Sequence, residues 1–196
     1  MAIVVIGGHS RNVGKTSVVA GLIAALPKCD WTAFKITQFG HAGHPAGHAP
    51  SEEIPWRITQ EYEGSGRSDT SRFLAAGARA AFLVETQQGR LHEAMPVIQE
   101  KLAESTNSII ESNSILEFLR PDLYLVVLDP AIKDFKSSAQ RYFDRADAVL
   151  LHDGGIPQWQ AAAPCPTFRI SPPRYVGDDL IAFVSKRLPF APSGLL

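Results

Sequence analysis

The sequence predicts an α/β fold of three layers, in which a mostly parallel sheet carries helices on both faces. Short apolar runs alternate with helical segments along the chain, and that order requires parallel crossover connections. The first run, Ala2–Ile6, is rich in β-branched residues and lacks polar alternation, which is typical of a buried parallel strand. The stretch GGHSRNVGKTS, residues 7–17, follows directly and resembles a phosphate-binding turn between a strand and a helix.

The remaining elements follow in chain order. Ser17–Leu26 is alanine-rich and ends at Pro27, so it predicts a helix, and Trp31–Ile36 predicts the second strand. Leu123–Leu128 is the most strongly apolar run and predicts a further strand. We also expect strands at Ala80–Val84, Ser108–Ile110, Ala148–Leu151 and Thr167–Ile170, and helices at Thr70–Ala76, Leu91–Glu104, near Lys136–Asp144 and at Val176–Leu188.

The composition favours one soluble domain that spans residues 1–196 without an internal repeat. Hydrophobic residues make up 45% of the chain and charged residues 20%, the balance of a globular protein with a sizeable core. The formal net charge of −1 offers no basic surface, so we expect no nucleic-acid partner. No apolar run reaches about 18 residues, and the N-terminus lacks a basic leader, so we expect neither a membrane span nor a signal peptide. Cys29 and Cys165 form no metal or redox motif, which suits a reduced, cytoplasmic compartment.

One segment, residues 37–66, breaks the alternation of strands and helices and is predicted as a long loop. It is rich in Gly, His, Pro, Ser and charge, and it follows a strand at the edge where open α/β sheets bind ligands. Loops of this length are usually functional or mobile, so a lid is expected here. His41, His44 and His48 invite a zinc site, but their spacing fits no four-ligand set, and a substrate-contacting loop is favoured.

The glycine-rich stretch predicts a nucleotide site, although its spacing is unusual. Gly8 precedes Gly14 by five residues instead of the usual four, which puts His9 where the first glycine is expected. Backbone N–H groups would surround phosphate oxygens, and the helix that follows would direct its positive end toward them. We therefore expect the residues of this turn to bind GTP or ATP: Gly8, His9, Ser10, Arg11, Asn12, Val13, Gly14, Lys15, Thr16 and Ser17.

Two side chains of this turn have distinct expected roles. Lys15 would reach the outer phosphates, and we expect it to face solvent until phosphate arrives. The Thr16 hydroxyl would bind Mg²⁺. A chance Gly-Lys-Thr turn explains the pattern less well, because it would place a lysine at the start of a helix whose dipole disfavours it.

Several motifs resemble known families. The glycine spacing resembles dethiobiotin synthetase, and residues 12–16, NVGKT, look like the NSGKT loop of the molybdopterin-guanine dinucleotide biosynthesis protein B family. A longer stretch, GRSDTSRFLAAGARAAFLVETQQ at residues 66–88, resembles the same family. The resemblance covers about the first 115 residues and implies a P-loop NTPase. Beyond it, LRPDLYLVVLD and DRADAVLLHDG look more like dethiobiotin synthetase and the cobyrinic acid amidating synthases.

The resemblance carries over to single residues outside the loop. Lys35 matches the lysine of the family's IKH segment, whose histidine is Ile36 here, and Glu111 matches the glutamate of its LVEGF segment, whose glycine is Ser112 here. It implies a catalytic role for Lys15 and Lys35, and a magnesium site made of Thr16, Asp69 and Glu111.

Each carried-over residue also has a plain structural alternative. Asp69 precedes a predicted helix and could be its N-cap, while Glu111 and Lys35 could be exposed strand-end residues. A buried Glu111 would need a cation or hydrogen-bond donors. Asp129, His152 and Asp153 end later strands at the same sheet edge.

The sequence leaves the nucleotide base open. The Asn-Lys-x-Asp motif of many GTPases is absent, so GTP and ATP are both expected as possible ligands. Pro164–Pro173 predicts a loop after the last strand, and in dethiobiotin synthetase a loop in that region borders the base.

Three functions fit these patterns. The first is a GTP- or ATP-binding adaptor with weak hydrolysis that serves molybdenum-cofactor assembly beside a cofactor-biosynthesis enzyme. The second is an ATP-dependent synthetase for a small carboxylate or amine, with Lys35 and residues 37–66 holding the substrate. The third is a nucleotide-gated scaffold without turnover. The resembled families also imply a homodimer.

Overall fold

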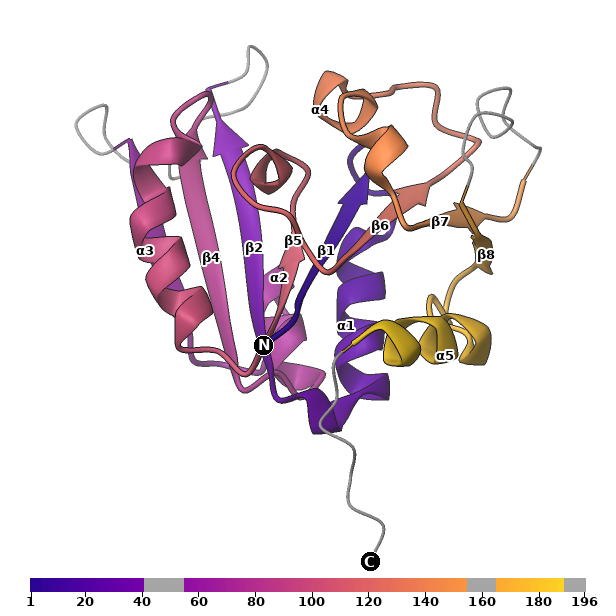
Figure 1. Cartoon of the computed structure of the whole chain (residues 1–196), viewed down its shortest axis with the longest axis horizontal. Coiled ribbons are helices and arrows are strands. Elements are labelled where there is room, and N and C mark those ends of the chain that lie inside the picture. Colours follow the sequence, from indigo (N-terminus) through magenta and orange to yellow (C-terminus); the bar gives the residue numbers. More distant parts are fainter. Residues whose placement is uncertain (41–54, 155–164, 189–196) are drawn as a thin grey trace, which may run out of the picture.

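The computed structural model describes residues 1–40, 55–154 and 165–188. Figure 1 shows a single sheet that these residues share, with helices packed against it. The strands are β1 (Ile3–Gly8), β2 (Trp31–Phe39), β3 (Trp56–Glu61), β4 (Ala80–Gln87), β5 (Asn107–Glu111), β6 (Leu123–Leu128), β7 (Ala148–His152) and β8 (Thr167–Ile170). The α-helices are α1 (Lys15–Ala25), α2 (Asp69–Ala75), α3 (Leu91–Ala103), α4 (Ser137–Gln140) and α5 (Asp178–Arg187).

The sheet has eight strands in the order β3-β4-β2-β5-β1-β6-β7-β8, and only β3 runs antiparallel to its neighbour. β1 therefore lies between β5 and β6, and the carboxyl ends of β1, β2, β5 and β6 meet at one edge. This arrangement confirms the predicted class, a mostly parallel sheet in three layers. It also brings the glycine-rich turn after β1 beside the ends of β5 and β6, as expected of ligand sites in open α/β sheets.

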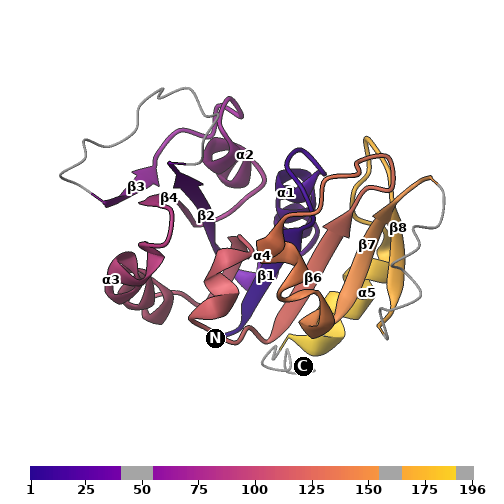
Figure 2. The same cartoon turned by 90° about the horizontal axis from the view of Figure 1, so that it is seen from above.

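The core has two parts, one on each face of the sheet. Along β1, Val4 and Ile6 pack into the layer with α1, α2 and α5, whereas Val5 packs into the layer with α3. Figure 2 shows the helices on the two sides of the sheet. Both faces are covered, which is why the central strands read as continuous apolar runs rather than alternating ones.

The structure corrects the prediction of a loop over residues 37–66. β2 continues to Phe39, and residues 56–61 form β3, an edge strand on β4. Trp56 and Ile58 are half-buried against the core, and Arg57 between them is exposed, so a strand alternation was present inside a segment dominated by polar composition.

Residues 62–66 form neither a helix nor a strand, as predicted for this part of the segment. Residues 41–54, including His41, His44 and His48, lie outside the described residues, as does Pro164. Among the described residues, no group of three or more His, Cys, Asp or Glu side chains is placed to hold a metal ion. None of the helices described is long and apolar enough to cross a membrane.

Candidate functional site

The glycine-rich turn joins β1 to α1 and leaves the first N–H groups of the helix without a capping side chain. Gly14 is the N-cap of α1 and has φ 88°, in the left-handed region that favours glycine, and Asn12 also has a positive φ of 57°. A turn of this kind aligns backbone N–H groups, and α1 adds the positive end of its dipole. The arrangement can bind an anion such as a phosphate.

The extra residue of the turn is accommodated by His9. Its backbone N–H donates to the Val127 carbonyl oxygen at 3.2 Å, so the chain continues to pair with β6 after β1 ends. Its side chain is buried, and Nε2 lies 3.2 Å from the carbonyl oxygen of Ile132. A glycine is not needed at this position because the imidazole packs beneath the neighbouring segment, away from the turn.

Asn113 holds the first glycine of the turn and was not found by the sequence analysis. The Gly8 N–H donates to Asn113 Oδ1 at 3.0 Å, and Asn113 Nδ2 donates to the Gly8 carbonyl oxygen at 2.9 Å. β5 ends at Glu111, so the Asn113 amide continues the pairing of β1 by two further hydrogen bonds. The signal in the sequence was an amide residue just after a buried strand end, which is also common in ordinary turns.

Lys15 does not face solvent, contrary to the expectation. Its Nζ donates to the Ser10 carbonyl oxygen at 2.6 Å, so the side chain lies along the turn. Burial lowers the pKa of Lys15 to about 8, an effect that Glu111 opposes and that the like charges of Lys136 and Lys35 enhance. The ammonium group is therefore held without a full counter-charge, which favours an incoming anion.

The four remaining site residues meet at the ends of β2 and β5 and the starts of α1 and α2. Thr16 Oγ1 donates to Glu111 Oε2 at 2.8 Å. Lys35 Nζ bonds Glu111 Oε1, its neighbour across β2 and β5, and lies 2.9 Å from Asp69 Oδ2. The structure thus brings Thr16, Lys35, Asp69 and Glu111 into one cluster, which we call the carboxylate cluster.

The plain structural alternatives for these residues are wrong. Glu111 is only 3% exposed, so it is not an exposed strand-end residue. Asp69 is not the N-cap of α2, because Ser68 takes that position and its Oγ accepts from the Ser71 N–H at 3.0 Å. Lys35 is mostly buried, and although burial works against its charge, Glu111 and Asp69 together raise its pKa.

The carboxylate cluster suits magnesium chemically. Mg²⁺ prefers oxygen ligands, and one hydroxyl and two carboxylates lie together directly beside the turn. Glu111 is a buried carboxylate whose partners are one hydroxyl and one ammonium group. Thr16 with Glu111, and Asp69 directly or through water, are the residues that would hold the ion.

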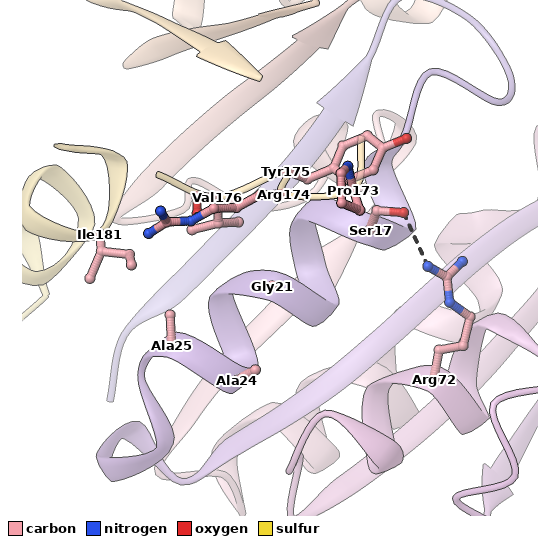
Figure 3. Close-up of a pocket in the computed structure, with 10 residues that line it drawn as sticks. All are labelled: Ser17, Gly21, Ala24, Ala25, Arg72, Pro173, Arg174, Tyr175, Val176 and Ile181. Carbon is pink, nitrogen blue, oxygen red and sulfur yellow. Dashed lines mark hydrogen bonds between the residues drawn. The ribbon is translucent and has the colours of Figure 1, made fainter. Parts of the chain in front are cut away.

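A groove of about 680 Å³ runs along α1 from Ser17 to Ala25. Figure 3 shows it between α1, Arg72 of α2 and the segment 173–176 that follows β8. Arg72 Nη2 donates to Ser17 Oγ at 3.0 Å, which ties α2 to the end of the turn. The volume lies in the range of small-molecule sites.

His152 and Tyr175 link this groove to the turn. His152 Nε2 lies 2.9 Å from the Val13 carbonyl oxygen and acts as the donor there, because a carbonyl can only accept. Its ring meets the Tyr175 ring edge-on at 5.7 Å. A Cβ on Gly14 would meet both rings, so glycine is required there by close approach as well as by φ.

Asp129, which was expected at the same sheet edge, stabilises a turn. Its Oδ1 accepts a hydrogen bond from the Ala131 N–H at 2.9 Å.

Comparison with known proteins identifies the fold. No known sequence family and no curated protein matches the chain. The crystal structure of HypB from Helicobacter pylori in complex with nickel is similar, with a TM-score of 0.51 and 16% identity over 94% of this chain and 86% of that one. LpxK from Aquifex aeolicus in complex with ATP has a TM-score of 0.50 and 19% identity over 86% of this chain. Bacillus subtilis MobB has a TM-score of 0.45 and 16% identity, over 96% of this chain and 98% of that one.

The likenesses to HypB and LpxK show that the chain shares the fold of these two proteins. The chain spans 53% of the length of LpxK, and the identities are low throughout. The likeness therefore concerns the fold, and the assignment of ligands rests on the geometry of the turn and of the carboxylate cluster.

Proposed function

We propose that the protein binds GTP or ATP with Mg²⁺ and hydrolyses the terminal phosphate slowly. The observation that carries this proposal is the bond from Thr16 to the buried carboxylate of Glu111, which joins the phosphate-binding turn to the carboxylate cluster. A turn that served only as a helix start would not need a buried charge beside it, because such a charge costs several kcal/mol unless it is paired.

The phosphates would lie over the backbone N–H groups of residues 10–14 and the start of α1. Lys15 would leave the Ser10 carbonyl oxygen and bond the outer phosphate oxygens. Mg²⁺, when bound, supplies positive charge to the same oxygens. A water molecule would attack the γ-phosphorus, and the bond to the β-phosphate oxygen would break. The nucleoside diphosphate and inorganic phosphate would then leave. The chain contributes position and charge, and no covalent step is needed.

The nucleoside would occupy the end of the groove beside Ser17 and Tyr175. Ser17 immediately follows Thr16, so a nucleotide whose outer phosphates reach Lys15 extends its sugar toward this end of the groove. Tyr175 is half-buried and offers a ring face or edge for a base, and Arg72 holds the Ser17 hydroxyl oxygen so that its proton stays free to donate.

A role in molybdenum-cofactor assembly, as in the molybdopterin-guanine dinucleotide biosynthesis protein B family, is supported by the motif at residues 66–88 and by the convergence of Lys35, Asp69 and Glu111. The synthetase alternative is supported by the glycine spacing of the turn. It needs Lys35 to hold a substrate carboxylate, whereas Lys35 already pairs with two carboxylates of the protein. The first role therefore explains the contacts better.

The proposal extends to the assembly of the protein. We expect one domain over residues 1–196 that acts as a cytoplasmic homodimer, which is what the resembled families imply. Light scattering at tens of micromolar tests this, because contacts with micromolar dissociation constants would be populated there. A monomer under these conditions would contradict the homodimer. It would not affect the proposal that the turn binds a nucleotide.

Phosphate release tests the proposed activity. The protein is incubated with Mg²⁺ and either ATP or GTP, with and without small amines and carboxylates. Slow release without any addition is expected, and Lys28→Met, a change of an exposed lysine, should leave it unchanged. Release that depends on an added amine or carboxylate would favour the synthetase instead. If no phosphate is released in any mixture, both the hydrolase and the synthetase are contradicted. The nucleotide-gated scaffold without turnover would then be the function that fits.

A further inference from the structure

The segment after β6 packs directly on the phosphate-binding turn through three contacts. Ser10 Oγ donates to Asp134 Oδ2 at 2.9 Å, and the Lys136 N–H donates to the His9 carbonyl oxygen at 2.8 Å. The His9 ring adds the third contact, at the Ile132 carbonyl oxygen. These contacts fix the backbone from which the Lys136 side chain starts, because two of them join neighbouring residues of the turn to Asp134 and to Lys136 itself.

The Lys136 side chain places a positive charge close to this turn. It is half-buried, and burial lowers its pKa first, followed by the repulsion of Arg11, while Asp134 opposes them. Lys136 also lowers the pKa of Lys15, and it does so more strongly than Lys35 does. Within the described part of the chain, no side chain forms an ion pair or a hydrogen bond with the Lys136 ammonium group.

Three lysines therefore approach the turn from both sides of β1. Lys35 comes from β2, on the side of the carboxylate cluster, and its charge is balanced by Glu111 and Asp69. Lys136 comes from the β6 side, and Lys15 lies between them on the turn. Among the described residues, no carboxylate forms an ion pair with Lys15 or Lys136, and the two like charges repel across the turn. The last phosphate of a triphosphate is the part of a nucleotide that reaches beyond Lys15.

We propose that Lys136 binds the terminal phosphate of the nucleoside triphosphate and stabilises the charge that gathers on its oxygens during hydrolysis. This inference rests on the proposed function. As the bond from the γ-phosphorus to the β-phosphate oxygen breaks, charge is shared between the three equatorial oxygens and the leaving oxygen. Lys136 stabilises the equatorial oxygens from the β6 side, opposite the carboxylate cluster. Ser10, which binds Asp134, keeps the segment in place.

This role predicts that Lys136 contributes to the affinity for nucleoside triphosphates but not to that for nucleoside diphosphates. A nucleoside diphosphate has no γ-phosphate for Lys136 to reach, so Lys136→Met should leave its affinity within about twofold of wild type. The affinity for a non-hydrolysable triphosphate analogue should fall about tenfold, which corresponds to roughly 1.4 kcal/mol. Lys136→Arg should retain most of the affinity, because the charge is kept.

Titration calorimetry with Mg²⁺ and both nucleotides, on wild type and variants, tests the inference. The control is Lys133→Met, which removes an exposed lysine three residues earlier and should change neither affinity. Circular dichroism verifies that each variant is folded. Equal losses for triphosphate and diphosphate, or no loss at all in Lys136→Met, would overturn the role of Lys136 while the proposed function stands. A wild-type protein that binds neither nucleotide would overturn the proposed function and this inference with it.

Discussion

The two ends of the candidate site are built differently. At the phosphate end, Glu111 is buried and bonded to Thr16 and Lys35 before any ligand is present. At the end proposed for the nucleoside, Tyr175 is half-buried, and Arg174 is exposed and bonds Asp178 and the Val176 carbonyl oxygen. Charges at the first end have lost water and depend on their partners, whereas side chains at the second end remain solvated.

This difference indicates which property each end determines. Under the proposed function, the buried charges of the phosphate end would determine the class of ligand, and changing them would cost much affinity. The solvated side chains of the nucleoside end would determine which base is preferred, and replacing them would cost little. Inorganic triphosphate separates the two ends experimentally, because it can contact only the phosphate end.

The largest effect on ligand binding is expected for Lys15→Ala. It should weaken nucleotide and inorganic triphosphate alike by at least about 100-fold, roughly 2.7 kcal/mol, because Lys15 is the cation of the turn itself. The fold should persist, since the one hydrogen bond of this ammonium group within the described residues goes to the Ser10 carbonyl oxygen. Calorimetry beside circular dichroism measures both. Unchanged affinity for either ligand would contradict the phosphate end as described.

Lys35→Met tests whether the phosphate end is held by paired charges. Glu111 and Asp69 would lose their shared cation, and we expect the free energy of unfolding to fall by about 3 kcal/mol. Mg²⁺ should recover part of the loss, because it can replace the ammonium group between the carboxylates. Urea denaturation with and without Mg²⁺ measures this, with Lys28→Met as the exposed control. A variant as stable as wild type without Mg²⁺ would show that the pairing is dispensable.

The pKa of Lys15 predicts a pH dependence of binding. Burial lowers that pKa to about 8 in the free protein, and a bound phosphate would raise it, so binding takes up a proton above pH 8. Affinity for the Mg²⁺–nucleotide complex should therefore fall about tenfold from pH 7 to pH 9, while Lys15→Arg should show a flatter profile because arginine stays charged. An affinity that rises over this range would contradict the assignment.

The smallest effect is expected at the nucleoside end. Tyr175→Ala should weaken nucleoside triphosphates about fivefold, since stacking on a base contributes roughly 1 kcal/mol or more. Inorganic triphosphate should bind as before. A matched titration of both ligands decides the point, and an equal loss for the two would mean that Tyr175 acts through Gly14 and the turn.

Much of the fold could be predicted because its central strands are buried on both faces. Leu123–Leu128 was predicted with the bounds that the structure gives, since this fully buried apolar run ends at a polar residue. Thr167–Ile170 also has its predicted bounds, although β8 is an edge strand with two exposed residues. β3 was missed because it is an edge strand, where only Trp56 and Ile58 carry the alternation and the flanking composition is that of a loop.

The candidate site could be predicted where a local motif fixes the geometry and not where the topology does. Lys15 and Thr16 follow from the turn, and a family resemblance selected Asp69 and Glu111, which the structure brings together. Asn113 and Lys136 could not be found, since their contacts with Gly8 and His9 join residues more than a hundred positions apart. Such contacts depend on strand order, which no local pattern contains.

The central claim is that residues 8–17 bind the phosphates of a nucleotide, and a calorimetric titration tests it most directly. Wild-type protein with Mg²⁺ is titrated with ATP, GTP and inorganic triphosphate, each up to millimolar concentration, where even weak binding is detected. The account predicts saturable binding of one nucleoside triphosphate per chain and competition from inorganic triphosphate, both lost in Lys15→Ala. Binding that survives in Lys15→Ala, or no binding of any of the three, would contradict it.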